Sequence, residues 1–243
     1  MKTTRAAARS SSFGLLVTES DPKSPAAEAY RTLRTNIQFA GLDEPVRTLL
    51  VTSAAAGEGK STTVANFGAV LAHAGSKVCV IDSDLRRPAL HRFFDIPNTA
   101  GLTTALVEGK SIEEMARPTR IPNLSILTSG PTPPNPAELV GSRRMRDLIE
   151  SSTQAYEYVI LDSPPIVSVS DATNLATLVS GVILVVRSGK VPQDVVRRTA
   201  EQIERVKGRI LGVLLNSVDL RRDAYYSHYY RYYRGYYSGN GMP

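Results

Sequence analysis

Tryptophan is absent from this chain of 243 residues, and Cys79 is its only cysteine. A single thiol excludes an internal disulfide framework and fits a reducing compartment. Cys79 lies in the apolar run of residues 78–81, where we expect it to be a small buried side chain.

Long apolar stretches are also missing. No run approaches the roughly 20 apolar residues that a transmembrane helix requires. The N-terminal residues include no apolar region of the kind found in a secretory signal. We therefore expect a cytoplasmic protein that has no membrane span of its own.

Aromatic residues are scarce outside one C-terminal cluster. The chain has 11 tyrosines and 5 phenylalanines, and eight of the tyrosines lie between residues 225 and 237. Residues 221–243 contain almost no aliphatic side chains, so they are predicted to form a disordered tail. Taken alone, such a tail is equally compatible with low-complexity association or with stacking on nucleic acid.

Charge and composition exclude little more. Apolar residues make up 42% and charged residues 21%, which excludes a chain that is disordered, collagen-like or coiled-coil throughout. The formal net charge is +6, but the basic residues are spread along the chain. Charge alone therefore does not distinguish a nucleic acid, an anionic lipid or a nucleotide as the ligand.

The order of apolar and helical segments predicts an α/β fold. Short continuous runs rich in Val, Ile and Leu are typical of strands buried on both faces, and they cover residues 48–52, 78–81, 124–127, 158–161, 182–186 and 210–215. Helix-length segments separate them, including residues 61–75, 135–151, 171–180 and 193–208. This alternation predicts a doubly wound, mostly parallel sheet flanked by helices, which binds ligands beyond the carboxyl ends of its strands.

We divide the chain into three parts. Residues 1–23 are polar and rich in small side chains, and they are predicted to be a flexible N-terminal arm. Residues 24–220 form the predicted domain, and residues 221–243 the tail. The domain opens with Ser24-Pro25, a predicted helix N-cap and first turn, and its first helix is expected to end at Gly41.

A phosphate-binding loop follows the first predicted strand. Residues 53–62 read Ser-Ala-Ala-Ala-Gly-Glu-Gly-Lys-Ser-Thr and lead directly into a helix. Gly57 and Gly59 allow the backbone N–H groups to face an anion. Lys60 is expected to reach the β- and γ-phosphates, and the Ser61 hydroxyl to bind Mg²⁺. Ala54 stands where the general P-loop pattern has its first glycine, but the strand, the glycines and the helix still coincide.

Acidic residues end two other predicted strands. Asp82 and Asp84 are alternate residues after the run of residues 78–81, so their carboxylates are expected to project the same way. Asp162 follows the run of residues 158–161, as in a Walker B strand. A strand-end cap is the ordinary alternative for each acid, but a P-loop on a neighbouring strand favours a metal site.

Three of these segments together resemble the Walker A, Walker A′ and Walker B motifs of the bacterial tyrosine kinases: Gly-Glu-Gly-Lys-Ser-Thr, Ile-Asp-Ser-Asp-Leu-Arg and Leu-Asp-Ser-Pro-Pro. The resemblance covers about residues 20–243 and includes the Pro-Pro-Asn-Pro-Ala-Glu-Leu stretch at residues 133–139. It implies a P-loop NTPase fold and an autophosphorylating protein-tyrosine kinase that uses ATP and Mg²⁺. These kinases govern capsule and exopolysaccharide synthesis.

The resemblance also implies a role for each site residue. Lys60, Asp82 and Asp84 are the expected catalytic residues, with Asp82 as the base, and Ser61, Asp84 and Asp162 are the expected metal site. Thr62 is expected near the α-phosphate and Asn216 near the adenine, although Asn is also common in strand-end turns. Arg86 either supports the carboxylates or phosphates or is an ordinary surface arginine. The expected nucleotide-binding residues are Gly57, Glu58, Gly59, Lys60, Ser61, Thr62, Arg86 and Asn216.

With kinase motifs present, the tail becomes the expected substrate. Its hydroxyls would enter the active site of a neighbouring subunit, and each phosphate would add about −1.5 to −2 charges to a tail that contains four arginines. The expected phosphoacceptors are Tyr225, Tyr226, Tyr229, Tyr230, Tyr232, Tyr233, Tyr236 and Tyr237.

The resemblance further implies partners. Glu28, Arg31 and Arg34 match a Glu-x-x-Arg-x-x-Arg motif that joins subunits of these kinases in a ring, although the spacing alone is also that of a solvated helix face. A separate transmembrane activator protein would recruit the chain to the inner face of the membrane. A cognate tyrosine phosphatase and exogenous protein substrates are also implied, and no nucleic acid is expected.

A nucleotide-dependent switch without tyrosine kinase activity is the alternative. ATPases of the ParA and MinD type share the fold and the acidic motifs, but they carry an extra lysine early in the P-loop. Ala55 occupies that position here.

Overall fold

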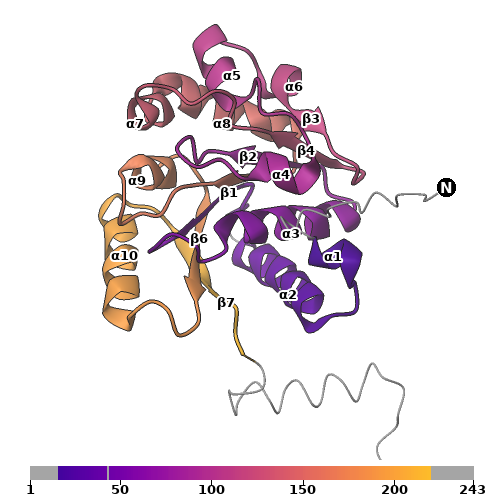
Figure 1. Ribbon diagram of the computed structural model, residues 1–243, viewed down its shortest axis with the longest axis vertical. Helices are drawn as coiled ribbons and strands as arrows, with labels where there is room; N and C mark the ends of the chain where they lie inside the picture. Colours follow the sequence, from indigo (N-terminus) through magenta and orange to yellow (C-terminus); the bar gives the residue numbers. More distant parts are fainter. Residues whose placement is uncertain (1–15, 43, 220–243) are drawn as a thin grey trace, which may run out of the picture.

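A single seven-stranded sheet lies at the centre of the molecule (Figure 1). The computed structural model describes residues 16–42 and 44–219, so the tail and most of the predicted arm lie outside the described residues. The strands are β1 (Thr48–Ser53), β2 (Val78–Asp82), β3 (Arg117–Pro118), β4 (Leu124–Leu127), β5 (Tyr158–Asp162), β6 (Gly181–Arg187) and β7 (Ile210–Asn216).

The strand order is β3-β4-β2-β5-β1-β6-β7, which confirms the doubly wound sheet. Every pairing is parallel except that of the short edge strand β3 with β4. Parallel strands end at the same edge, and the order places β2, β5 and β1 side by side. The register pairs Asp82 of β2 with Asp162 of β5, and Val51 of β1 with the same Asp162. The two acidic motifs and the P-loop therefore meet at one edge.

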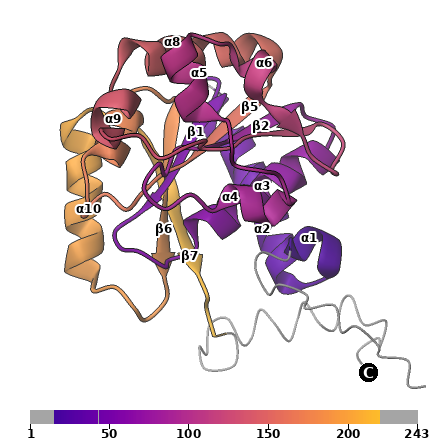
Figure 2. The ribbon, with the colours of Figure 1, turned by 45° about the horizontal axis from the view of Figure 1, so that its top comes forward.

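Helices cover both faces of the sheet (Figure 2). One face packs against α1 (Val17–Ser20), α2 (Pro25–Ala40), α3 (Lys60–His73) and α4 (Leu90–Phe94). The other face packs against α5 (Leu102–Glu108), α6 (Ile112–Met115), α7 (Pro136–Val140), α8 (Arg143–Ala155), α9 (Asp171–Ala176) and α10 (Gln193–Arg205). Strands β1 and β2 are buried along their whole length, as expected for a sheet covered on both sides. Within residues 16–42 and 44–219 no helix combines the length and the apolar character needed to span a membrane.

The first long helix forms where the sequence predicts it. The Ser24 side chain accepts a hydrogen bond from the N–H of Ala27 at 3.2 Å, and Pro25 occupies the first helical position. Tyr30 and Ile37 are buried against the core. The helix ends at Gly41, as expected.

The predicted arm is wrong at its C-terminal end, because residues 17–20 form helix α1. Leu16 is 1% exposed, and the N–H of Val17 donates to Asn66 Oδ1 of α3 at 2.7 Å. The segment is held by burial against α3, and a single turn is too short to show helical periodicity in the sequence.

The predicted helix over residues 135–151 is also corrected, because the structure divides it into α7 and α8. Gly141 ends α7, and the Ser142 side chain caps α8 by accepting a hydrogen bond from the N–H of Met145 at 3.3 Å. A Gly-Ser pair inside a helical pattern is a stop and a start signal, and here it acts as both.

Candidate active site

The P-loop connects β1 to α3 and is bent at two glycines. Gly57 has φ +77° and Gly59 has φ +98°, values that side-chain-bearing residues rarely adopt. A Cβ atom at Gly59 would also collide with the side-chain amide of Asn216. The loop ends at Lys60, the first residue of α3, so the N-terminus of a long buried helix faces the space beyond the strand ends.

Glu58 stabilises the loop with its side chain. The carboxylate is 2% exposed, and it accepts hydrogen bonds from the N–H of Ala55 at 2.7 Å and the N–H of Arg187 at 3.0 Å. It therefore ties the P-loop to the end of β6. The Glu58 side chain is therefore engaged within the protein, and the predicted contact of Glu58 with the nucleotide would be made by its backbone.

Asn216 holds the same loop from the last strand. Its Nδ2 donates to the carbonyl oxygen of Glu58 at 2.8 Å, and its Oδ1 accepts from the N–H of Ser217 at 2.8 Å. Asn216 thus makes the strand-end turn that was one of its two interpretations, and it also lies against the P-loop. Its contact with an adenine stays a prediction.

Two buried carboxylates lie beside the P-loop. Asp82 is 0% and Asp162 is 1% exposed. Asp82 Oδ2 accepts hydrogen bonds from the N–H groups of Ala89 and Leu90, both at 2.9 Å. Among the described residues, Asp82 Oδ1 and both carboxylate oxygens of Asp162 have no hydrogen-bond partner. Buried anionic oxygens without partners are costly, so this arrangement suits a positive ligand.

The surroundings shift the protonation of both acids. Burial, followed by the charge of Asp162, raises the pKa of Asp82 well above its ordinary value. Burial also raises the pKa of Asp162 to about 7, although the Ser61 hydroxyl and the Lys60 charge act in the opposite direction. The charge of Asp84 raises both pKa values, which places it next to the pair. The structure thus brings together Lys60, Ser61 and the three predicted acids.

The residues present fit a nucleotide-bound magnesium ion. Within the described residues, no group of three or more His, Cys, Asp or Glu side chains is placed to hold a metal ion alone. Mg²⁺ in nucleotide sites is bound by one or two carboxylates together with phosphates and waters, so such a cage is not required. The unpartnered oxygens of Asp162 and the neighbouring Ser61 hydroxyl supply the oxygen donors that Mg²⁺ prefers.

Asp84 lies in a tight turn after β2. Its Oδ1 accepts hydrogen bonds from the N–H of Arg86 at 3.3 Å and the N–H of Arg87 at 2.9 Å. The guanidinium of Arg86 is paired with Asp171 of α9, with Nε to Oδ2 at 2.9 Å and Nη2 to Oδ1 at 3.1 Å. The guanidinium thus forms a two-point ion pair within the chain, and a contact of Arg86 with the nucleotide stays a prediction. Sequence reasoning missed Asp171, since an acid at a helix start resembles an ordinary first-turn residue.

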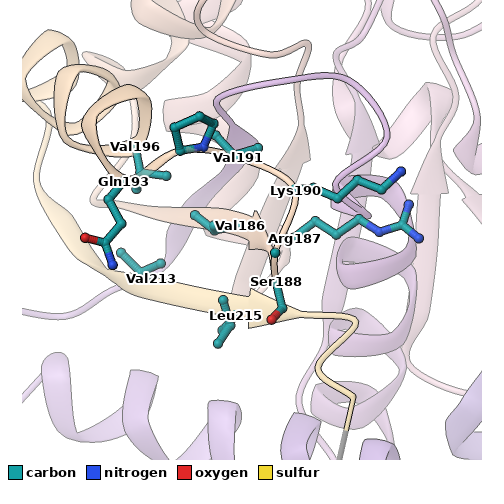
Figure 3. Close-up of a pocket in the computed structure, with 11 residues that line it drawn as sticks. Val186, Arg187, Ser188, Lys190, Val191, Gln193, Val196, Val213 and Leu215 are labelled. Atoms are coloured by element: carbon teal, nitrogen blue, oxygen red, sulfur yellow. The ribbon is translucent and has the colours of Figure 1, made fainter. Parts of the chain in front are cut away.

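A cavity with a volume of about 600 Å³ lies between α10 and β7 (Figure 3). Its apolar lining includes Val196, Val213 and Leu215. At its rim, Arg187 and Lys190 point away from this lining (Figure 3), and Arg187 Nη1 donates to the carbonyl oxygen of Gly57 at 3.4 Å. An apolar hollow therefore adjoins the P-loop at the β7 edge of the sheet.

The remaining predicted site residues lie on α3, on α2 and in the tail. Thr62 follows Ser61 in the first turn of α3 and is exposed, and its contact with the α-phosphate stays a prediction. On α2, Arg31 pairs with Glu28 at 2.7 Å and also donates to the carbonyl oxygen of Pro22 at 2.7 Å, while Arg34 is half-buried. The eight tail tyrosines lie outside the described residues.

Comparison with known proteins agrees with this geometry. The model of the ParA family, described as NUBPL iron-transfer P-loop NTPase, matches residues 45–230. Tyrosine-protein kinase YwqD of Bacillus subtilis is 42% identical over 213 residues, which are 88% of this chain and 90% of the relative. The putative tyrosine-protein kinase CapB of Staphylococcus aureus is 34% identical, over 90% of this chain and 96% of its own. The solved kinase domain of the Escherichia coli tyrosine kinase ETK has a TM-score of 0.81 and 32% identity, and the match covers 89% of this chain and 85% of that one.

Proposed function

The chain belongs to the bacterial tyrosine-protein kinases, a family with a P-loop nucleotide-binding fold, and we propose that it transfers the γ-phosphoryl group of ATP to its own C-terminal tyrosines. The observation that carries the site assignment is the pair of buried acids beside a phosphate-binding loop, because three of their four carboxylate oxygens have no partner among the described residues. A switch without kinase activity does not account for the kinase family to which the chain belongs. This chain also has Ala55 where the ParA- and MinD-type switches carry their signature lysine.

The P-loop binds and orients the triphosphate. The backbone N–H groups of residues 57–62 and the N-terminus of α3 face the phosphates, and the Lys60 ammonium neutralises charge on the β- and γ-phosphates. Asn216 holds the loop in this shape through Glu58. The apolar cavity beside β7 supports placement of the adenine ring of ATP at this end of the site.

Ser61, Asp84 and Asp162 would hold Mg²⁺, which neutralises phosphate charge in the transition state when it is bound. Asp82 is the proposed base. Its Oδ1 takes the proton of the tyrosine hydroxyl as the tyrosine oxygen bonds to the γ-phosphorus, and the bond between that phosphorus and the β–γ bridging oxygen breaks to release ADP. The raised pKa of Asp82 brings this acid closer to neutral pH, where a base is most effective.

Incubation of the pure protein with Mg-ATP is expected to label several of the eight tail tyrosines. They are numerous, and the sequence predicts that no hydrophobic core keeps their hydroxyls from the active site. Mass spectrometry of the proteolysed chain identifies the modified residues. A variant with all eight tyrosines changed to Phe is expected to lose the label and to keep nucleotide binding. Hydrolysis of ATP at equal rates by both proteins, without phosphotyrosine in either, would instead support the switch alternative.

We also propose that α2 joins subunits of this kinase in a ring. The Glu28 and Arg31 side chains are only 30% and 39% exposed, respectively, and they are already paired, so the motif is pre-ordered for contact with a second subunit. Arg31→Ala combined with Arg34→Ala is expected to reduce the particle mass measured by light scattering. Arg198→Ala, which removes a 74% exposed arginine from an ion pair on α10, is the matched control. An unchanged mass in the double variant would exclude this interface.

The proposed cellular setting follows the relatives. Similarity to CapB supports a role in capsule or exopolysaccharide synthesis and export, with a separate transmembrane activator that recruits the kinase to the membrane. A cognate tyrosine phosphatase would reset the tail, and other proteins would serve as further substrates. Co-purification of the full chain with the cytoplasmic end of a candidate activator, with and without Mg-ATP, tests the recruitment.

A further inference from the structure

Asp171 is a fully buried acid that has no part in the roles assigned above. It is the first residue of α9, and its side chain is 0% exposed. Both of its carboxylate oxygens accept hydrogen bonds from Arg86, whose side chain is 40% exposed. A buried charge needs a well-aligned partner, and a two-point arginine–carboxylate pair is the most directional partner available. The pair thus fixes the position of Arg86 and not merely its charge.

The position of Arg86 in turn determines the turn that carries Asp84. The N–H groups of Arg86 and Arg87 donate to Asp84 Oδ1, so the carboxylate is held by the backbone of the residues that follow it. Displacement of Arg86 would move these donors. Asp84 itself is only half-buried, and the two residues whose N–H groups hold its carboxylate are exposed. The turn therefore depends on the anchoring of Arg86 by Asp171.

The pair of Arg86 and Asp171 also connects the two chain segments that follow the acidic ends of β2 and β5. Asp84 follows β2, whereas Asp171 begins the helix that follows β5 and Asp162. The two strands are in register at Asp82 and Asp162, but beyond this point the chain leaves the sheet. The contact of Arg86 with Asp171 joins the two segments again beyond the strand ends.

We propose that Asp171 is a positioning residue of the metal site, which holds the Asp84 turn at the distance from Asp162 that magnesium binding requires. This inference rests on the proposed metal site but not on tyrosine as the acceptor. Residues that support metal-site groups without touching the ion typically change metal affinity by about 10–100-fold when they are mutated.

The test measures ADP binding by the full-length protein in EDTA and over a range of Mg²⁺ concentrations, by calorimetry. For Asp171→Asn we expect an about tenfold or larger increase in the Mg²⁺ concentration at which ADP affinity is half-maximally enhanced. ADP affinity in EDTA is expected to stay within about twofold of the wild type, because the P-loop is unchanged. Asp194→Asn, which disrupts an exposed pair with Arg198 at 3.9 Å, is the control and should show no change.

Arg86→Lys provides a second variant in case Asp171→Asn folds poorly, since lysine keeps the charge and loses the two-point geometry. It should shift the Mg²⁺ dependence in the same direction, and the double variant should cost no more than the larger single change. A lowered melting temperature with unchanged Mg²⁺ dependence would overturn the proposal and leave the pair a purely structural contact. If Mg²⁺ does not change the ADP affinity of the wild type, both this proposal and the proposed metal site are overturned. A wild type whose ADP affinity depends on Mg²⁺ as expected but whose tyrosines are not labelled by Mg-ATP would contradict only the kinase assignment to the tail.

Discussion

Lys60→Met is expected to lower autophosphorylation of the tail by about a thousandfold, while the fold is retained. Lys60 is 8% exposed and opens α3, so its ammonium lies in a water-poor position where charge stabilisation of a transferring phosphoryl group is large. Methionine has a similar length and preserves the packing of the stem. Phosphotyrosine in the purified variant, measured after incubation with Mg-ATP, gives the result directly.

Lys110→Met is the matched control for this experiment. Lys110 is an exposed lysine in a surface ion pair with Glu108, so its loss should leave labelling within about twofold of the wild type. Persistent labelling of the Lys60 variant at the wild-type rate would remove Lys60 from the catalytic assignment.

The same variant distinguishes transfer between subunits from transfer within one chain. Its P-loop is inactive but its eight tail tyrosines are intact. When it is mixed with active wild-type protein carrying a mass tag, its tail should become labelled if the tyrosines enter a neighbour's site. Labelling of the wild-type tail alone would show that transfer occurs within one chain.

The sheet and the phosphate loop were predictable because their signals are local. Continuous runs of Val, Ile and Leu mark strands covered on both faces, and β1, β2, β4, β5, β6 and β7 all lie within a residue or two of the predicted runs. Glycines followed by Lys60 and Ser61 predict the loop for the same reason, since the backbone geometry is set by neighbouring residues. The contact of Asp82 with Asp162 depends also on the strand order, which places β2 beside β5 and which the alternation of strands and helices does not predict.

The partners of the polar side chains were not predictable, because they come from distant segments. Glu58 bonds to Arg187, Asn216 bonds to Glu58, and Arg86 bonds to Asp171, and each pair is separated by many residues. Sequence spacing shows that a side chain is charged but not whether tertiary packing has already given it a partner. The intrachain partners of Glu58 and Arg86 were missed for this reason, and the nucleotide contacts expected of both residues stay predictions. Short helices such as α1, α4 and α6 were missed because a single turn has no period.

The acids of the proposed metal site are expected to reduce stability when no ligand is bound, and this effect depends on pH. Asp162 has a pKa raised to about 7 in the folded protein, above its value in an unfolded chain. Between about pH 4 and pH 7 the folded state therefore binds more protons than the unfolded state, so the free energy of unfolding falls as pH rises. The raised pKa of Asp82 acts in the same direction.

Asp162→Asn is accordingly expected to stabilise the metal-free protein at about pH 8 by about 2 kcal/mol, because a buried carboxylate becomes a neutral amide. At about pH 5, where the folded wild type is protonated at Asp162, the difference should shrink below about 0.5 kcal/mol. Urea unfolding in EDTA at both pH values measures the two free energies. Asp147→Asn, which changes an exposed carboxylate on α8, should show neither effect.

The same substitution should abolish kinase activity and most of the stabilisation by Mg-ADP, since ligand binding to the folded state raises the free energy of unfolding by an amount that increases with the logarithm of its affinity. Wild type and variant should thus exchange order: the variant is the more stable protein in EDTA and the less stable one in saturating Mg-ADP. A variant that is destabilised under both conditions would mean that the Asp162 carboxylate supports the fold rather than a cation. The reversal is expected because the oxygens that cost stability in the empty site are the oxygens that the ligand satisfies.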